Sequence, residues 1–154
     1  MTTNAARLRP GDPCAFVVFG AMGDLTKRKL LPALHNLRAN GLLPRDFAFI
    51  GVARRPLDDR TYREYAAAAT GETGSGKEDD DFSSRVHYVK GDFEDPATYE
   101  ALSAALARAA RDHGTSGNAI FYLATPEVPW SRAARASAAA SASYVAGSSK
   151  SPFT

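Results

Sequence analysis

VVFGAMGDLTKRK, the stretch Val17–Lys29, decides the fold. It begins inside the apolar run Cys14–Phe19, and its two glycines, Gly20 and Gly23, precede a charged segment that starts at Asp24. A short, unbroken apolar run is typical of a strand that is buried on both faces of a parallel sheet. Glycines between such a run and a helical pattern indicate a tight turn. The stretch therefore predicts a strand, a glycine turn and a helix in succession.

The segment Asp24–Ala39 predicts the helix that follows the turn. Leu30, Leu34 and Leu37 would share one face at the helical period of 3.6 residues. Pro32 cannot donate a backbone hydrogen bond, so we expect a kink or a restart of the helix at that residue.

Strands and helices alternate along the chain as far as residue 124. Asp58 and Asp95 are suitable N-caps, and Pro96 suits the first helical position after Asp95. The polar segment Thr70–Asp81 indicates a loop. The predicted strands are Phe47–Ala53, Val86–Val89 and Ala119–Ala124; the predicted helices run from Asp58 to about Ala69, and from Asp95 with Tyr99, Leu102, Leu106 and Ala109 facing inward.

The order β-α-β-α-β-α-β predicts an α/β fold, a Rossmann-like, doubly wound parallel sheet that is incomplete. Residues 1–13 are expected to form a flexible arm, and residues 14–126 the nucleotide-binding domain. Alanine and serine dominate residues 127–154, and few large apolar side chains could anchor that segment. We expect an irregular or weakly helical, divergent tail there.

The charge balance excludes some classes of partner. Nineteen Lys and Arg residues against seventeen Asp and Glu residues leave a net charge of +2, which gives no basic footprint for nucleic acid or an anionic membrane. Cys14 is the single cysteine, and we interpret it as a small apolar residue that opens the first strand. No signal peptide or spanning segment is visible, so we expect a cytoplasmic protein.

The glycine turn predicts an anion site. Gly20 permits a backbone conformation that a side chain would disfavour, and Gly23 would let a pyrophosphate approach the backbone. The first N–H groups of the next helix favour negative charge at the same place. The G-x-x-G spacing alone is weak, but a strand before it and a helix after it favour nucleotide binding. The alternative is a structural turn with no ligand.

Arg54 and Arg55 help to choose the nucleotide. They follow the second predicted strand, where NAD sites usually carry a carboxylate that accepts a hydrogen bond from the ribose 2′-hydroxyl. Guanidinium groups cannot accept that bond, but they can bind a 2′-phosphate. The pair therefore favours NADP over NAD, and the alternative is a solvated basic pair without a ligand.

Two other patterns carry less weight. The segment Gly71–Lys77 has the spacing of a P-loop, but Glu78 stands where a Ser or Thr should bind magnesium, and we interpret it as a flexible loop. His35, His87 and His113 are scattered, and we interpret them as surface or edge residues. The sequence therefore predicts no metal cluster and no catalytic residue.

Several motifs together resemble the N-terminal part of glucose-6-phosphate dehydrogenase, from about Ala15 to Pro126. The strongest is FGAMGDLTKRKLLPALHNL, close to the family's G-A-S/T-G-D-L-x-x-R/K-K-L-x-P-A-L fingerprint, with Met22 in place of Ser or Thr. NGLLP, GVARRPL, YVKGDFEDPATYEAL and FYLATP follow in the family's order.

The resemblance implies a set of cofactor residues. Arg54 would bind the NADP 2′-phosphate with Arg55 beside it, and glucose 6-phosphate would be oxidised to 6-phosphogluconolactone, the entry step of the pentose phosphate pathway. The cofactor turn would be Gly20, Ala21, Met22, Gly23, Asp24 and Leu25, and Ala124, Thr125 and Pro126 would lie near the nicotinamide.

The resemblance also implies what the chain lacks. Glu127 replaces the family's second proline, and the E-K-P-F-G and R-I-D-H-Y-L-G-K segments, which contact the substrate and supply the histidine base, are absent. We therefore expect a chain truncated or frameshifted after Pro126, inactive alone, and monomeric because the family dimerises through its second domain. The alternatives are a non-catalytic NADP-binding or regulatory module and an unrelated small reductase, although Tyr144 and Lys150 are too far apart for a Y-x-x-x-K pair.

Overall fold

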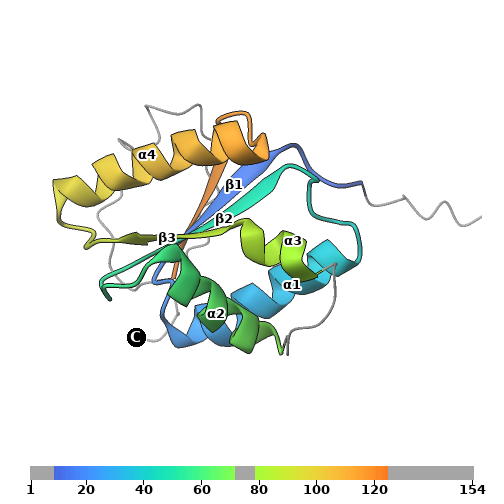
Figure 1. Ribbon diagram of the computed structural model, residues 1–154, viewed down its shortest axis with the longest axis horizontal. Coiled ribbons are helices and arrows are strands. Elements are labelled where there is room, and N and C mark those ends of the chain that lie inside the picture. Colours follow the sequence, from blue (N-terminus) through green and yellow to red (C-terminus); the bar gives the residue numbers. More distant parts are fainter. Residues whose placement is uncertain (1–8, 72–78, 125–154) are drawn as a thin grey trace, which may run out of the picture.

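Four parallel strands form one sheet in the order β3-β2-β1-β4 (Figure 1). The computed structural model describes residues 9–71 and 79–124, and the rest of the predicted arm and the predicted tail lie outside these ranges. The α/β prediction and its element order are confirmed. The elements are β1 (Cys14–Phe19), η1 (Thr26–Leu30), α1 (Leu31–Ala39), β2 (Phe47–Ala53), α2 (Asp59–Thr70), α3 (Asp79–Ser84), β3 (Val86–Lys90), α4 (Pro96–His113) and β4 (Ala119–Leu123).

Helices cover both faces of the sheet, with α4 on one face and α1, α2 and α3 on the other (Figure 1). Alternate residues of β1 therefore enter two different cores. Val17 packs on the α4 side with Leu102, whereas Val18 packs on the opposite side with Leu31 and Tyr62. This explains why β1 has no polar residue, because neither of its faces meets water. Cys14 is buried at its first position, as expected.

The helix after the glycine turn differs from its predicted register. It contains a π-helical segment, η1, whose wider turn closes with the Leu31 N–H donating to the Thr26 carbonyl. The extra residue rotates the following helix, so Leu31 is fully buried and Leu37 is 39% exposed. The predicted stripe of Leu30, Leu34 and Leu37 is therefore wrong at Leu37. The expected interruption near Pro32 takes the form of this π segment, which ends just before α1 begins.

A short helix, α3, begins inside the segment that was predicted to be a loop. Thr70 ends α2, and the loop prediction is wrong at residues 79–81, which are helical. The physical reason is Phe82, which is buried against the α1–α2 face, with the His35 ring 6.1 Å away in an edge-on contact. Most of the P-loop-like segment Gly71–Lys77 lies outside the described residues.

The caps of the two long helices follow the sequence prediction. The Asp58 side chain accepts a hydrogen bond from the Thr61 N–H at 2.8 Å, and that of Asp95 accepts from the Ala97 N–H at 2.9 Å. These bonds satisfy N–H groups that have no acceptor inside the helix. They fix where each helix leaves the carboxyl end of the preceding strand, which is where ligands bind in such folds.

Candidate cofactor site

The glycine turn is fastened to the end of β2. Gly20 has a φ of +85°, a conformation that L side chains rarely adopt. Its N–H and that of Ala21 donate to the Val52 carbonyl at 3.0 and 3.2 Å. The Gly23 N–H then donates back to the Gly20 carbonyl at 2.9 Å, and a Cβ at Gly23 would lie 3.1 Å from that oxygen. The backbone conformation at Gly20 therefore favours glycine, and a side chain at Gly23 would make a tight contact within the turn.

Two buried hydroxyl groups hold the carbonyls of the turn. The Thr26 hydroxyl donates to the Gly20 carbonyl at 3.0 Å, and the Tyr62 hydroxyl donates to the Ala21 carbonyl at 3.1 Å. Both residues are fully buried. These bonds hold two carbonyl oxygens that would repel an anion, and the donors to such an anion would be the first N–H groups of the following helix. Sequence reasoning missed both residues.

The remaining side chains of the predicted turn lie in different environments. Met22 is partly buried, and its side chain packs against the apolar core on the α1–α2 side of the sheet. Asp24 is exposed and lies 3.4 Å from the Arg28 guanidinium. Leu25 is 44% exposed. The Lys27 ammonium lies over the Tyr65 ring, 5.6 Å from its centre.

Arg54 and Arg55 lie at the same edge of the sheet as the turn. This follows from the β1–β2 register, which pairs Phe19 with Val52 and so places the residues after both strands side by side. Both guanidinium-bearing residues are exposed. Within the described part of the chain neither forms an ion pair. The structure thus brings the predicted basic pair and the glycine turn to one edge.

Ala124 lies on the other side of β1. Its N–H donates to the Phe19 carbonyl at 3.0 Å, directly before Gly20. In the order β3-β2-β1-β4 the chain connections diverge between β1 and β4, and ligands of such sheets bind in the crevice at that point. Ala124 therefore lies beside the turn, and its proximity to the nicotinamide stays a prediction. Thr125 and Pro126 lie outside the described residues.

Three tyrosines pack behind the site. The Tyr62 ring lies 4.9 Å from that of Tyr88 and 5.7 Å from that of Tyr65. Burial raises the pKa of all three phenols above the ordinary value, while the Arg55 charge opposes the shift at Tyr65 and Tyr88. All three hydroxyls therefore stay protonated at neutral pH, and those of Tyr62 and Tyr88 donate hydrogen bonds to backbone carbonyls.

The histidine prediction needs a correction. His87 on β3 and His113 at the end of α4 are not scattered, because their Nε2 atoms lie 2.8 Å apart. The Nδ1 atom of His87 lies 3.1 Å from an Asp59 carboxylate oxygen, and Arg108 is 3.5 Å from that same oxygen. His87 is buried on an edge strand. Among residues 9–71 and 79–124, no group of side chains has the composition and spacing to hold a metal ion.

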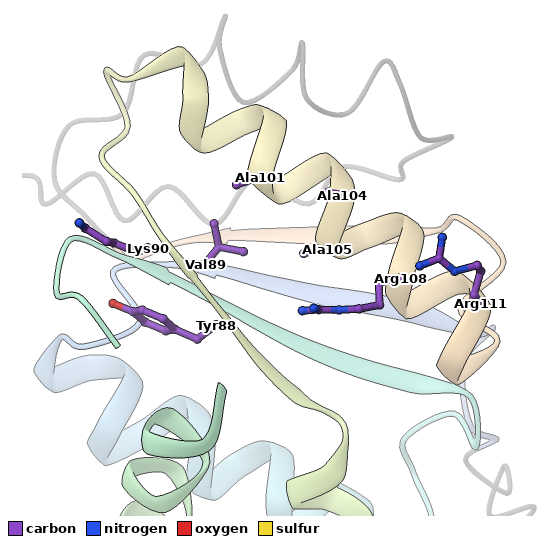
Figure 2. Close-up of a pocket in the computed structure, with 8 residues that line it drawn as sticks. All are labelled: Tyr88, Val89, Lys90, Ala101, Ala104, Ala105, Arg108 and Arg111. Carbon is purple, nitrogen blue, oxygen red and sulfur yellow. The ribbon is translucent and has the colours of Figure 1, made fainter. Parts of the chain in front are cut away.

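A separate groove of about 480 Å³ lies between β3 and α4 (Figure 2). Val89 and small alanine side chains line its middle, Lys90 lies toward one end, and the Arg108 and Arg111 side chains lie toward the other. It contains neither the glycine turn nor the Arg54–Arg55 pair, so it is distinct from the cofactor site. None of the helices in the described ranges is long and apolar enough to cross a bilayer.

Comparison with known families agrees with this geometry. Residues 17–148 match the family model described as the NAD-binding domain of glucose-6-phosphate dehydrogenase. The matched range includes the glycine turn, the basic pair and Ala124, and it continues past Pro126. The domain boundaries at residues 13 and 126 and the frameshift stay predictions.

Curated relatives of this chain are glucose-6-phosphate 1-dehydrogenases. The glucose-6-phosphate 1-dehydrogenase of Chlamydia pneumoniae is 38% identical over 133 residues, which are 84% of this chain and 26% of the relative. That of Bacillus subtilis is 37% identical over 108 residues, 70% of this chain and 22% of the relative. The chain therefore spans about a quarter of the length of the curated relatives it matches.

Solved structures give the same result. A glucose-6-phosphate dehydrogenase in complex with its substrate glucose 6-phosphate superposes with a TM-score of 0.65 at 28% identity, covering 77% of this chain and 25% of that one. The Mycobacterium avium glucose-6-phosphate 1-dehydrogenase gives a TM-score of 0.65 at 25% identity, covering 88% and 29%. The chain belongs to the glucose-6-phosphate dehydrogenase family and matches its N-terminal domain, which binds a nicotinamide cofactor.

Proposed function

We propose that this chain binds NADP and prefers it to NAD. The observation that carries the proposal is the pairing of Phe19 with Val52. It sets a glycine turn with inward carbonyls beside two guanidinium groups that form no ion pair with any residue the structure describes. The turn would hold the diphosphate, and Arg54, with Arg55 beside it, would hold the 2′-phosphate. A bare turn without the basic pair would support NAD equally well.

The residues fit the cofactor in two further ways. Gly23 has no side chain, so no side-chain atom at this position of the turn would stand between the backbone and a diphosphate. The turn residues Gly20, Ala21, Met22, Gly23, Asp24 and Leu25 lie in one continuous stretch that enters a helix, whose first N–H groups favour an anion. Ala124, Thr125 and Pro126 would adjoin the nicotinamide.

The activity of the glucose-6-phosphate dehydrogenase family supports a reaction as well as a cofactor. We propose that the protein takes part in oxidation of glucose 6-phosphate to 6-phosphogluconolactone, with bound NADP accepting the hydride. The 154 residues hold no counterpart of the family's substrate and base segments, so this 154-residue piece, assayed by itself, should bind the cofactor without turnover. NADPH formation from glucose 6-phosphate by the isolated chain would contradict the second statement.

Replacing Arg54 tests the basis of the preference. Arg54→Ala should weaken NADP binding roughly 10- to 100-fold, because a charge-assisted contact contributes about 1.5–3 kcal/mol. Binding of NAD should not change, since NAD carries no 2′-phosphate. The measurement is a pair of calorimetric titrations, one with each cofactor.

Arg60→Ala is the matched control. Arg60 is an exposed α2 residue whose ion pair with Glu64 on its own helix should contribute little. Its removal changes net charge by the same amount as Arg54→Ala. An equal loss of NADP affinity in both variants would mean that general charge, and not Arg54, attracts the cofactor.

A further inference from the structure

The loop that carries Arg54 and Arg55 is held by two backbone hydrogen bonds and by one side-chain hydroxyl group. The Gly91 N–H donates to the Ala53 carbonyl at 2.9 Å, and the Leu57 N–H donates to the Arg55 carbonyl at 3.0 Å. The Tyr88 hydroxyl on β3 lies 2.7 Å from the Arg55 carbonyl and 3.1 Å from the Ala53 carbonyl. A phenol has one proton to donate, so the shorter contact takes the larger share and the longer one completes a three-centre bond. The two carbonyls bracket Arg54. Tyr88 therefore fixes the backbone on both sides of the proposed phosphate ligand.

A second hydroxyl holds the other half of the site. Tyr62 donates to the Ala21 carbonyl in the glycine turn, and its ring packs on that of Tyr88. Gly51 in β2 leaves room for this packing, since a Cβ there would lie 2.8 Å from both the Tyr62 ring and the Ala21 side chain. Tyr62 thus supports the part of the site that NAD and NADP share, and Tyr88 supports the part that only NADP would use.

We propose that Tyr88 is a positioning residue for cofactor specificity, acting through the backbone of Arg54 to favour nucleotides that carry a 2′-phosphate. The inference rests on the proposed NADP binding. A long arginine side chain loses conformational entropy when it binds a phosphate, and a free backbone would add to that loss. The Tyr88 hydroxyl adds to the backbone bonds that anchor residues 53–55, and so would reduce the backbone part of this loss before the cofactor arrives. Tyr88 need not touch the cofactor to have this effect.

Removing each hydroxyl separately tests the division of roles. Tyr88→Phe should weaken NADP binding about 3- to 10-fold and leave NAD binding unchanged, because one neutral hydrogen bond is worth about 0.5–1.5 kcal/mol. Tyr62→Phe should weaken both cofactors to a similar extent. The readout is the ratio of the two dissociation constants, which a general loss of stability would not move.

Tyr99→Phe is the matched control. The Tyr99 hydroxyl also donates to a backbone carbonyl, that of Phe93, at 2.7 Å. Its removal should change the unfolding temperature without changing the NADP-to-NAD ratio. Because phenylalanine keeps each ring in place, all three variants are expected to fold, and thermal unfolding checks this.

The outcomes separate this inference from the proposed function. If the wild type binds NADP and NAD equally, the proposed preference itself fails. If the wild type prefers NADP and Tyr88→Phe keeps the same ratio, or loses affinity for both cofactors alike, the role of Tyr88 is overturned while NADP binding stands. A selective loss of NADP affinity in Tyr88→Phe alone supports it.

Discussion

Gly51 shows how closely single residues determine the site. It lies in the middle of β2, where glycine normally weakens a strand, yet the Tyr62 ring and the Ala21 side chain occupy the space that a Cβ would take. The glycine thus lets α2 approach the sheet closely enough for Tyr62 to reach the turn. The packing of β2 against α2 and the contact between Tyr62 and the glycine turn therefore both depend on the absence of a Cβ at Gly51.

Gly51→Ala should therefore damage both stability and binding. We expect a loss of about 1–3 kcal/mol in the free energy of unfolding, as for other overpacked cores, and weaker binding of NADP and NAD alike. Denaturant unfolding and calorimetric titration measure the two effects. Gly11→Ala is the control, because nothing lies within 4 Å of its Cβ position. Unchanged stability in Gly51→Ala would show that Tyr62 does not need this space.

The site residues that the sequence predicted differ from those it did not predict in how far along the chain their partners lie. Gly20 and Arg54 were found because each acts at a position defined by its own neighbours, directly after a strand. Tyr62 and Tyr88 were missed because their partners Ala21 and Arg55 are 41 and 33 residues away in the sequence. Such contacts exist only after the chain has folded. Tyr88 begins the motif YVKGDFEDPATYEAL that carries part of the family resemblance, but nothing in that motif indicates which carbonyl its hydroxyl bonds.

At the level of elements, hydrophobic periodicity predicted strands better than helix faces. β1 and β2 match their predicted bounds because unbroken apolar runs have no competing interpretation. The buried face of α1 was predicted less well, because the π turn before it adds one residue to the helical turn. No pattern in the sequence predicts that π turn. α3 was missed because one buried phenylalanine among acidic residues looks like a loop.

The cluster of Asp59, His87 and His113 joins three elements, α2, β3 and α4. Burial and the neighbouring His87, together with Arg85 and Arg63, lower the pKa of His113, and Asp112 opposes the shift. At Asp59, burial opposes ionisation, but hydrogen bonds from His87 and from the Tyr88 N–H outweigh it and lower the pKa. Both groups therefore bind protons less readily in the folded protein than in the unfolded chain.

This cluster predicts a loss of stability in acid. The unfolded chain takes up a proton at His113 near its ordinary pKa of 6.5 while the folded protein does not, so the free energy of unfolding should fall as the pH drops below that value. The decrease continues as Asp59 is protonated at still lower pH. Two protonated imidazoles could not share the 2.8 Å contact. Denaturant unfolding at pH 7.5 and 5.5 measures the effect.

Replacing two histidines separately tests whether the cluster causes the pH dependence of stability. His113→Gln should flatten the change in stability between pH 7.5 and 5.5, because it removes the titrating partner of His87. His35→Gln, which alters a histidine that packs on Phe82 outside the cluster, should keep the wild-type change. If His113→Gln keeps the full pH dependence as well, the cluster is not its source.

At the scale of the molecule, the described chain forms one half of a doubly wound fold. The outer edge of β3 is covered by side chains of α2, since Asp59 accepts from the Tyr88 N–H at 2.7 Å and Arg63 donates to the Val86 carbonyl at 2.8 Å. At the opposite edge, β4 pairs with β1 within the described residues. The order of strands was predictable, because right-handed crossovers leave few arrangements for alternating strands and helices. The edge contacts were not.

The glycine turn and the Arg54–Arg55 pair should together select NADP over NAD. Calorimetric titration of the wild-type 154-residue chain with NADP and with NAD tests it most directly. We expect NADP to bind at least about tenfold more tightly than NAD, because one charge-assisted contact to the 2′-phosphate contributes that much. Equal affinity for the two cofactors, or binding of neither, would contradict it.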